Sequence, residues 1–312
     1  MMPRREPSFR RSHPILDFTN DEIQDSENFS RFGLGMKVST PEQFLKSSRL
    51  VVRGGQRGMR PPRRLLLDYL PPVGNQGNQG SCVGWSTAYY AYTYGIAKQR
   101  RLDQNRLAEG KFQFSPAFIY NQINHGEDKG SYIFDAFEIL KKKGCATLDR
   151  MPYHENDFTS QPNNSALSRA ELFKSPEVGC LVQNNNTNLS KLEDMKTFLA
   201  VANNPLVAAI NVHEDFFQIP VTPGFVYERR NDSAFKGRHA VAIVGYDDSL
   251  GAFRMVNSWG SRWGEGGFAW LGERFVLNHL TEAWAFVPGG LTARTFSRNA
   301  SPEIRLEPPQ RR

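Results

Sequence analysis

The 312 residues are 39% hydrophobic and 12% aromatic, enough for a packed globular core, and they include no signal-peptide-like apolar run and no membrane span of ~18 apolar residues. The net charge of +7 is +6 in residues 1–64 (13 basic and 7 acidic), −2 in residues 65–288 (21 basic and 23 acidic) and +3 in residues 289–312 (5 basic and 2 acidic). The excess of basic residues therefore lies in the end segments, and we expect no folded basic face and no specific nucleic-acid binding. Three cysteines without a Cys-x-x-Cys pair give no basis for a disulfide framework or a metal site, and favour an intracellular (cytoplasmic) chain or one delivered by a non-classical route.

Residues 1–64 form a basic N-terminal extension that ends in the linker-like sequence RGGQRGMRPPRR. Residues 289–312 form a basic C-terminal tail that we expect to be disordered. We interpret both as solvated segments, and contact with an anionic membrane or RNA surface is the alternative.

The first half of the chain between these segments has the spacing of helices. A buried helix is predicted from Ser81 to about Arg101, with basic residues in its last turn. A second helix is predicted at SPAFIYNQINH, capped by Ser115, and a third at SYIFDAFEILKKKG, which ends at Gly144. The polar, Asn-rich region 156–188 is predicted to be looped.

After Leu206 the pattern changes to short β-branched and aromatic runs separated by turns, in PLVAAINV, GFVYER, HAVAIVGYDD, AFRMVNSW, GFAWLGE and EAWAFV. Such runs are typical of an antiparallel sheet or barrel. We therefore predict an α+β fold, with a helical half, a strand half and a cleft between them as the natural place for a site.

Cys82 is the cysteine whose surroundings indicate chemistry. It lies in the first turn of the predicted helix, where unpaired N–H groups lower the pKa of a thiol. Gly77 and Gly80 precede it, and because they lack a Cβ they let the backbone approach a bound carbonyl. Cys145 and Cys180 lack this setting, and we interpret them as structural.

A thiolate nucleophile needs a partner that acts as both base and acid, which in practice is histidine. Of the six histidines, His239 alone opens an apolar strand. Asn257 ends the next strand 18 residues later, where hairpin pairing can bring its oxygen to the ring N–H and Trp259 can cover the bond. Taken alone, a buried histidine beside a turn asparagine is the commoner explanation.

Three segments, QGNQGSCVGWS, HAVAIVGY and NSWGSRWGEGGF, resemble the signature blocks of the papain-like cysteine peptidases, in that family's order of Gln, Cys, His and Asn. NNPLVAAINV, GFVYE and KKKGCATLDRMPY extend the resemblance, which implies a two-lobed peptidase domain over residues 65–288. A helical lobe would carry the cysteine, and an antiparallel β-barrel-like lobe the histidine and asparagine. The separation of Cys82 and His239 is 157 residues, slightly above the usual ~130–150.

The resemblance assigns Cys82 as nucleophile, His239 as its acid-base partner, Asn257 as the residue that orients His239, and Gln76 with the Cys82 N–H as the oxyanion hole. It implies acyl transfer from a protein or peptide substrate through a thioester, with no cofactor and no metal. The same resemblance puts Ala209 and Ala240 in the wall of a pocket for the side chain two residues upstream of the cleaved bond, so we expect an apolar or aromatic side chain there. Gly130 matches a glycine whose backbone binds extended substrate, and an ordinary turn is the equal alternative.

Several positions depart from the family pattern. Gln79 stands where many secreted members have a disulfide cysteine, which agrees with an intracellular chain. Val83 replaces the tryptophan that usually follows the nucleophile, with Trp85 two places later, and Arg238 replaces the usual Asp or Asn before the histidine. The family's long inhibitory prosegment, with its helix motif, is not recognisable in residues 1–64.

Two other functions fit the same residues: a papain-fold binding protein without turnover, and a transamidase or isopeptidase with the same Cys-His chemistry. The complete set of Gln76, Cys82, His239 and Asn257 favours an enzyme. We expect residues 1–64 to occlude the cleft, because the extension joins close to the predicted catalytic helix; a delivery or docking role, or neither role, are the alternatives. The oligomeric state is left open.

Overall fold

The structure of the chain is a computed structural model that describes residues 32–53, 60–174, 177–183, 189–287 and 303–309. Its helices are α1 (Pro41–Lys46), α2 (Cys82–Gly84), η3 (Trp85–Tyr92), α3 (Thr93–Arg100), α4 (Gln104–Leu107), η4 (Gly110–Phe112), α5 (Pro116–Ile123), α6 (Ile133–Lys142), α7 (Asn164–Glu171), α8 (Ser190–Val201), η5 (Glu214–Gln218) and α9 (Glu273–His279). Its strands are β1 (Met36–Lys37), β2 (Arg49–Arg53), β3 (Arg63–Leu65), β4 (Ser131–Tyr132), β5 (Val178–Val182), β6 (Leu206–His213), β7 (Val226–Tyr227), β8 (Phe235–Asp247), β9 (Ala252–Val256), β10 (Phe268–Gly272), β11 (Leu280–Phe286) and β12 (Glu303–Glu307). None of the helices in these ranges combines the length and the apolar character needed to cross a bilayer.

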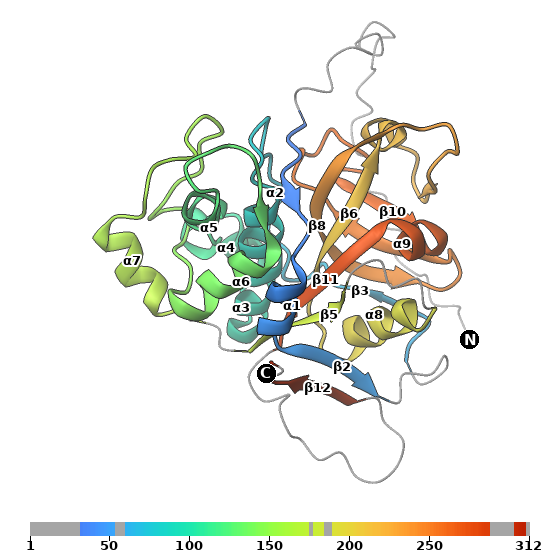
Figure 1. The fold of residues 1–312 in the computed structure, drawn as a ribbon, viewed down its shortest axis with the longest axis horizontal. Coiled ribbons are helices and arrows are strands. Elements are labelled where there is room, and N and C mark those ends of the chain that lie inside the picture. The colour runs from blue at the N-terminus through green and yellow to red at the C-terminus, as the bar shows by residue number, and fades with distance from the viewer. Residues whose placement is uncertain (1–31, 54–59, 175–176, 184–188, 288–302, 310–312) are drawn as a thin grey trace, which may run out of the picture.

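The elements separate into a helical lobe and a sheet lobe (Figure 1). α2 to α7 form the helical lobe, and the large sheet with α8 and α9 forms the other. The strands of the large sheet follow the order β12-β2-β5-β11-β6-β8-β9-β10-β7, with β3 beside β8. The predicted α+β division is confirmed, but this sheet is open at β12 and β7, so the barrel-like closure that we expected is not formed.

A long helix begins at Cys82 and ends at Arg100, as predicted, but its hydrogen bonding changes along the way. The middle part, η3, is π-helical, an uncommon form that often occurs near functional sites. The Ser86 hydroxyl donates to the carbonyl of Cys82 at 2.8 Å within the first turn. Arg101 ends the helix in a left-handed conformation with φ of 51°.

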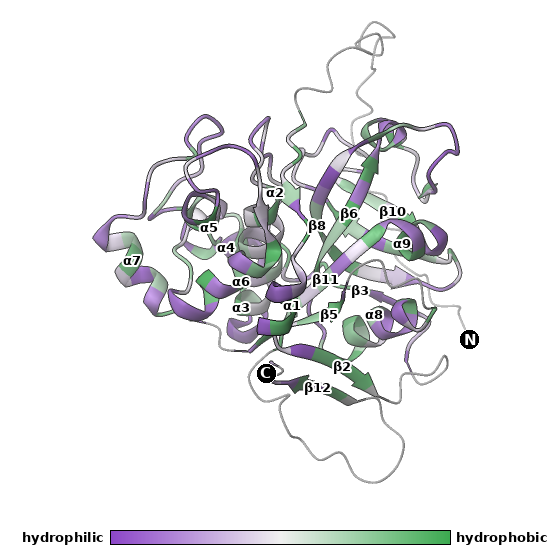
Figure 2. Cartoon of the chain, viewed as in Figure 1, coloured by the Kyte–Doolittle hydropathy of each residue, from purple (hydrophilic) through white to green (hydrophobic). Residues whose placement is uncertain are grey.

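The second and third predicted helices are also present. Ser115 caps α5 by accepting a hydrogen bond from the Phe118 N–H at 3.1 Å, and Gly144 follows α6 with φ of 79°. The prediction of a loop over 156–188 was wrong in part, because this region contains α7 and β5. α7 begins where the Asn163 side chain accepts from the Ala166 N–H at 2.9 Å, so one of the asparagines that suggested a loop is a helix cap. Figure 2 shows that α7 mixes hydrophilic and hydrophobic residues, as expected for a helix with one face on the core.

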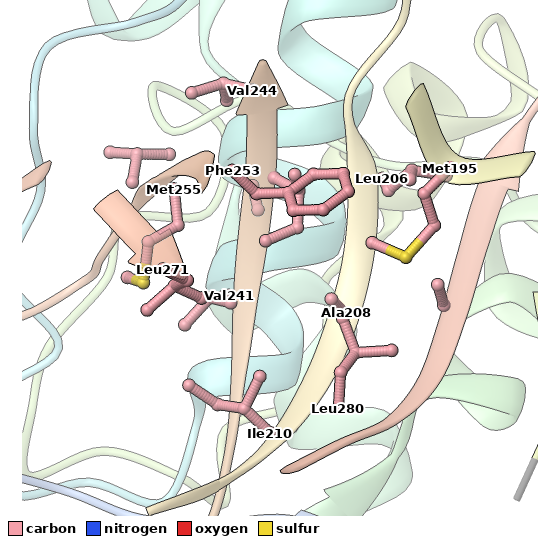
Figure 3. Close-up of a cluster of buried hydrophobic side chains, with 14 of the residues drawn as sticks. Met195, Leu206, Ala208, Ile210, Val241, Val244, Phe253, Met255, Leu271 and Leu280 are labelled. Carbon is pink, nitrogen blue, oxygen red and sulfur yellow. The ribbon is translucent and has the colours of Figure 1, made fainter. Parts of the chain in front are cut away.

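The strand half of the chain folds around a core of buried apolar side chains in the sheet lobe. Side chains from β6, β8, β9, β10, β11 and α8 pack together in Figure 3, where Met195, Leu206, Ala208, Ile210, Val241, Val244, Phe253, Met255, Leu271 and Leu280 are labelled. Alternate residues of β6, from Leu206 to Val212, therefore point into this core. The residues between them face the helical lobe, where the side chains of the candidate site lie.

Both end segments of the chain take part in the fold. Residues 303–307 form β12, which pairs antiparallel with β2 over five residues, so the expectation of a disordered tail over 289–312 was wrong for this part. β2 meets the rest of the sheet through Arg49 and Cys180 of β5. Residues 1–31, 54–59, 288–302 and 310–312 lie outside the described ranges.

Candidate active site

The thiol of Cys82 lies at the interface of the two lobes. α2 begins at this residue, and Cys82 is completely buried in a cluster that includes Ala209 of β6 and Ala240 of β8. The predicted position at a helix start is therefore observed. The same cluster contains both predicted pocket residues, and the Ala240 backbone hydrogen-bonds the thiol.

His239 and Asn257 lie together at the end of a hairpin. Asn257 directly follows β9, which pairs antiparallel with β8, and its Oδ1 lies 2.8 Å from His239 Nε2. The ring of Trp259 stacks on the imidazole with centroids 4.5 Å apart. Tyr90 of η3 donates its hydroxyl to the carbonyl of Asn257 at 2.7 Å, which fixes this hairpin against the long helix.

Gln76 is buried between the loop before α2 and the loop after β9. Its Oε1 accepts the Ser258 hydroxyl at 2.5 Å, and its backbone N–H donates to the Ser258 carbonyl at 2.8 Å. Its Nε2 donates to the carbonyl of Gln79 at 2.7 Å and to the carbonyl of Gly33 at 3.0 Å. The side-chain amide is thus oriented by its own loop and already binds a peptide carbonyl.

That carbonyl belongs to an N-terminal stretch, residues 32–39, which we call the cleft segment. In Figure 1 this blue segment descends between the helical lobe and β8 to reach α1. The Gly33 N–H donates to the Gly77 carbonyl at 3.0 Å, and the Trp259 indole N–H lies 3.4 Å from the Gly33 carbonyl. The cleft segment is therefore bound to both lobes at once.

Gly35 is the point where the cleft segment passes the thiol. Its carbonyl accepts the Ser131 N–H at 2.7 Å, and the next two residues, β1, pair parallel with β4. A Cβ on Gly35 would lie 2.0 Å from the Gly80 carbonyl oxygen, and a Cβ on Gly130 would lie 2.0 Å from the Gly35 carbonyl oxygen. Gly130 has φ of 77°, so it both forms a turn and allows this close approach.

The two ends of the cleft segment bind residues that the sequence analysis did not single out. Phe32 packs on Phe217 at 5.8 Å and on Trp259 at 4.8 Å between ring centroids. At the other end, Ser39 donates its N–H and hydroxyl to the two carboxylate oxygens of Glu282, at 2.6 and 2.8 Å. The only signal for Glu282 in the sequence was a single charge within the apolar strand LTEAWAFV.

Burial dominates the acid-base properties of the covered site. It raises the pKa of the Cys82 thiol to about 11, against opposing backbone hydrogen bonds from Ala240 and Gly35. It also lowers the pKa of His239 to about 4, against the hydrogen bond from Asn257. With the cleft segment in place, the neutral thiol and the neutral imidazole are therefore the favoured forms.

The remaining predicted positions lie around this centre. Gln79 Nε2 donates to the Glu155 carbonyl at 2.9 Å, so it ties two loops together at the position of the missing cysteine. Trp85 packs edge-on against Tyr153. Val83 is fully buried, and Arg238 lies over the ring of Phe235, 5.6 Å from its centroid.

Cys145 follows α6, and Cys180 lies in β5. Both are buried free thiols, and burial raises the pKa of each well above its usual value. Burial raises the pKa of Cys82 as well, so Cys82 differs from these two thiols in its contact with the cleft segment at Gly35. A structural role for Cys145 and Cys180 stays a prediction.

Residues 64–279 match the family model described as papain family cysteine protease. The chain is 27% identical over 214 residues to an uncharacterized peptidase C1-like protein of Acanthamoeba polyphaga mimivirus, covering 67% of this chain and 68% of that protein. It is 31% identical over 206 residues to pro-cathepsin H of Mus musculus, covering 63% of this chain and 55% of that protein. The chain also matches a thiol protease of Hemerocallis sp., of which it spans 49%, so it covers about half the length of these two relatives. Among solved structures, xylellain, a cysteine protease from Xylella fastidiosa, superposes with a TM-score of 0.68 at 22% identity, over 81% of this chain and 95% of that one.

Proposed function

The chain belongs to the papain family of cysteine proteases, and from this premise we propose that it is a cysteine endopeptidase whose nucleophile is Cys82. The observation that supports this most directly is the hydrogen bond from Gln76 Nε2 to the Gly33 carbonyl at 3.0 Å, beside the buried thiol. A group that already binds one peptide carbonyl there can bind the carbonyl of a scissile bond.

In the proposed reaction, His239 removes the proton of the Cys82 thiol, and the sulfur attacks the carbonyl carbon of the substrate. The oxygen becomes an oxyanion, which accepts hydrogen bonds from Gln76 Nε2 and from the Cys82 N–H. As the C–N bond breaks, His239 returns the proton to the leaving amine and a thioester remains. Water, deprotonated by His239, then releases the acid and restores the thiol.

Asn257 and Trp259 act on this reaction through His239. The Asn257 Oδ1 at 2.8 Å from Nε2 leaves Nδ1 as the nitrogen available for proton transfer with the thiol. The Trp259 ring, stacked on the imidazole, shields that hydrogen bond from water. These roles are the ones that the resemblance to the papain family assigns to a Gln, Cys, His and Asn that follow in this order along the chain.

We also propose that the cleft segment keeps the enzyme latent. It fills the position of a substrate carbonyl at Gln76, lies against the thiol at Gly35 and pairs with β4 through β1. A peptide substrate needs the same hydrogen-bonding groups, so the two compete. Turnover then requires the cleft segment to leave, while β2 keeps it tethered to the fold.

Hydrolysis of a mixed peptide library by the full chain with Gly35→Ala, which should displace the cleft segment, and by the same chain with Cys82→Ala tests the proposed function. We expect new peptide termini with Gly35→Ala and none when Cys82→Ala is added. Products joined to an added amine would instead indicate a transamidase. If the fold is intact and the cleft open but no peptide is cleaved, the result would indicate a papain-fold binding protein.

A further inference from the structure

A pocket of about 210 Å³ lies on the sheet lobe between the loop after β7 and helix α9, and we call it the β7–α9 pocket. Glu228 and Arg229 line it from the loop, and Arg274, Phe275 and His279 line it from the helix. A single water molecule takes up ~30 Å³ in the liquid, so this space is large enough for a small ligand.

The two carboxylates near this pocket are already bound by other groups. Glu228 accepts hydrogen bonds from the backbone N–H groups of Arg274 and Phe275 at the start of α9, and it lies 3.7 Å from Arg274 Nε. Asp215 accepts three hydrogen bonds, from the Tyr227 hydroxyl, the Ser233 hydroxyl and the Arg230 N–H. Within the described residues, neither carboxylate forms an ion pair with Arg229.

Arg229 therefore brings a positive charge to the pocket that has no counter-charge. Its Nη2 donates to the carbonyls of Asn231 and Ser233, both at 3.1 Å, and these partners are neutral. Its Nε is buried and has no hydrogen-bond acceptor in the part of the chain that the structure describes. A buried donor is normally bonded, and a bond from a guanidinium to an anionic oxygen is stronger than one between neutral groups. The missing partner of Nε is thus best supplied by an anion.

Two histidines near Arg229 also indicate an anion. His279 lines the pocket, and His213, which is 6% exposed, packs edge-on against it with ring centroids 4.8 Å apart. The Nδ1 atom of His213 is buried and has no hydrogen-bond partner among the described residues. Burial, His213, Arg229 and Lys191 together lower the pKa of His279 to about 4, while Asp215 opposes this shift. The electrostatic potential at His279 therefore disfavours a further positive charge and favours a negative one.

The β7–α9 pocket is separate from the catalytic centre. Phe275, which lines the pocket, stacks on Phe216 of η5 with ring centroids 6.4 Å apart, and Phe216 packs edge-on against Trp259 at 5.8 Å. Trp259 in turn stacks on His239. Two aromatic rings thus lie between the wall of the pocket and the imidazole, so a ligand in the pocket does not occupy the position of a substrate.

We propose that the β7–α9 pocket binds a phosphate group, as the free ion or as part of a small phosphomonoester, with Arg229 as its principal partner. Arg229 Nε would donate to one phosphate oxygen, and Arg274 and His279 would face the others. A phosphate group carries nearly two negative charges and several acceptor oxygens, which suits two arginines and a histidine better than the single charge of a carboxylate. The site goes beyond the proposed peptidase function, so Cys82→Ala should bind phosphate as the wild type does.

Calorimetric titration of the full chain with sodium phosphate at constant ionic strength tests this site. We expect one saturable site, whose affinity Arg229→Gln lowers by about 10- to 100-fold, the range for losing a hydrogen bond to a charged group. Arg230→Gln is the matched control and should keep the wild-type affinity, because Arg230 is 69% exposed and faces Asp215 and Asp232. Tighter binding of glycerol phosphate than of inorganic phosphate would identify a phosphomonoester, and equal or weaker binding would identify the free ion. No saturable binding by the wild type, or equal affinities of the two variants, overturns the proposal.

The ring of His279 gives a second measurement that leaves Arg229 unchanged, which is needed because Arg229 also holds the turn at Asn231. Bound phosphate places negative charge beside His279 and should raise its pKa from about 4 towards the usual 6.5. NMR titration of the ring C–H signal with and without phosphate measures this pKa, and the spectrum of His279→Gln assigns the signal. A pKa of His279 that phosphate leaves unchanged overturns the proposal, even if Arg229→Gln weakens binding.

Discussion

The side-chain amide of Gln76 donates a hydrogen bond to the carbonyl oxygen of Gly33 at 3.0 Å, although the two residues are 43 positions apart. The chain therefore binds its own N-terminal segment with the group proposed to stabilise the oxyanion. Gly33, Gly35 and Ser39 then connect the two lobes across the thiol.

Gly35→Ala should open the cleft. The new Cβ would lie 2.0 Å from the Gly80 carbonyl oxygen, and neither backbone can move away cheaply. We expect peptidase activity of the full chain to rise about tenfold or more, since each lost buried hydrogen bond is worth ~1 kcal/mol. Gly95→Ala in α3, whose nearest atom would be 3.8 Å away, should leave activity unchanged. Equal activity of both variants and the wild type would argue against latency.

Gln76→Ala in the opened chain should lower kcat by ~10²–10³, the typical cost of losing one oxyanion donor. Steady-state kinetics with one peptide gives the value, and KM should change less than kcat. Gln79→Ala is the matched control, because the Gln79 side chain binds the Glu155 carbonyl and ties two loops together. A loss of similar size in both variants would point to loop disorder instead.

The pH dependence of thiol alkylation should differ between the covered and open forms. Burial raises the pKa of Cys82 to about 11, so alkylation of the wild type should increase with pH up to that value. Opening admits water, which lowers the thiol pKa and raises that of His239 from about 4 towards its usual 6.5. The Gly35→Ala chain should therefore react at neutral pH. Mass spectrometry of peptides measures the alkylation of Cys82 at each pH, with Cys145 and Cys180 as unreactive references. If the pH profiles of the wild type and of Gly35→Ala superimpose, the account is contradicted.

Arg60→Ala should destabilise the fold by ~1–3 kcal/mol, because it removes the cation from Glu193 and leaves Asp248 with Lys196 alone. The Arg60 side chain is 2% exposed and binds Glu193 at 2.6 Å and Asp248 at 2.8 Å. Arg63, 60% exposed and 3.2 Å from Asp247, is the matched control, and Arg63→Ala should cost less than ~1 kcal/mol. Urea unfolding measures both free energies, and equal losses would be inconsistent with the burial of Arg60.

Local patterns in the sequence were sufficient to predict the helix at Cys82, the Ser115 cap and the hairpin that joins His239 to Asn257. These depend on residues close in the chain or on two neighbouring strands. The alternation of apolar residues in FGLGMKVS indicates an extended segment, but it does not tell where the segment binds, because its partners lie 43 or more residues away. The Ser39 contact to Glu282 spans 243 residues, so only the folded chain reveals it.

β12 and α7 were missed for different physical reasons. β12 has five residues of alternating charge and apolar character, too few for a confident strand, and it forms only because β2 offers a partner. α7 lies in an Asn-rich region, where the same residue type that favours loops also caps helices.

Labelling of Cys82 by a thiol-directed epoxide, followed by mass spectrometry, tests the central claim most directly. The claim is that Cys82 is a nucleophile activated by His239 and covered by the cleft segment. We expect rapid labelling at Cys82 in the Gly35→Ala chain, slower labelling in the wild type, and none when His239→Ala is added. No labelling of the opened chain, or labelling that persists without His239, would contradict the account.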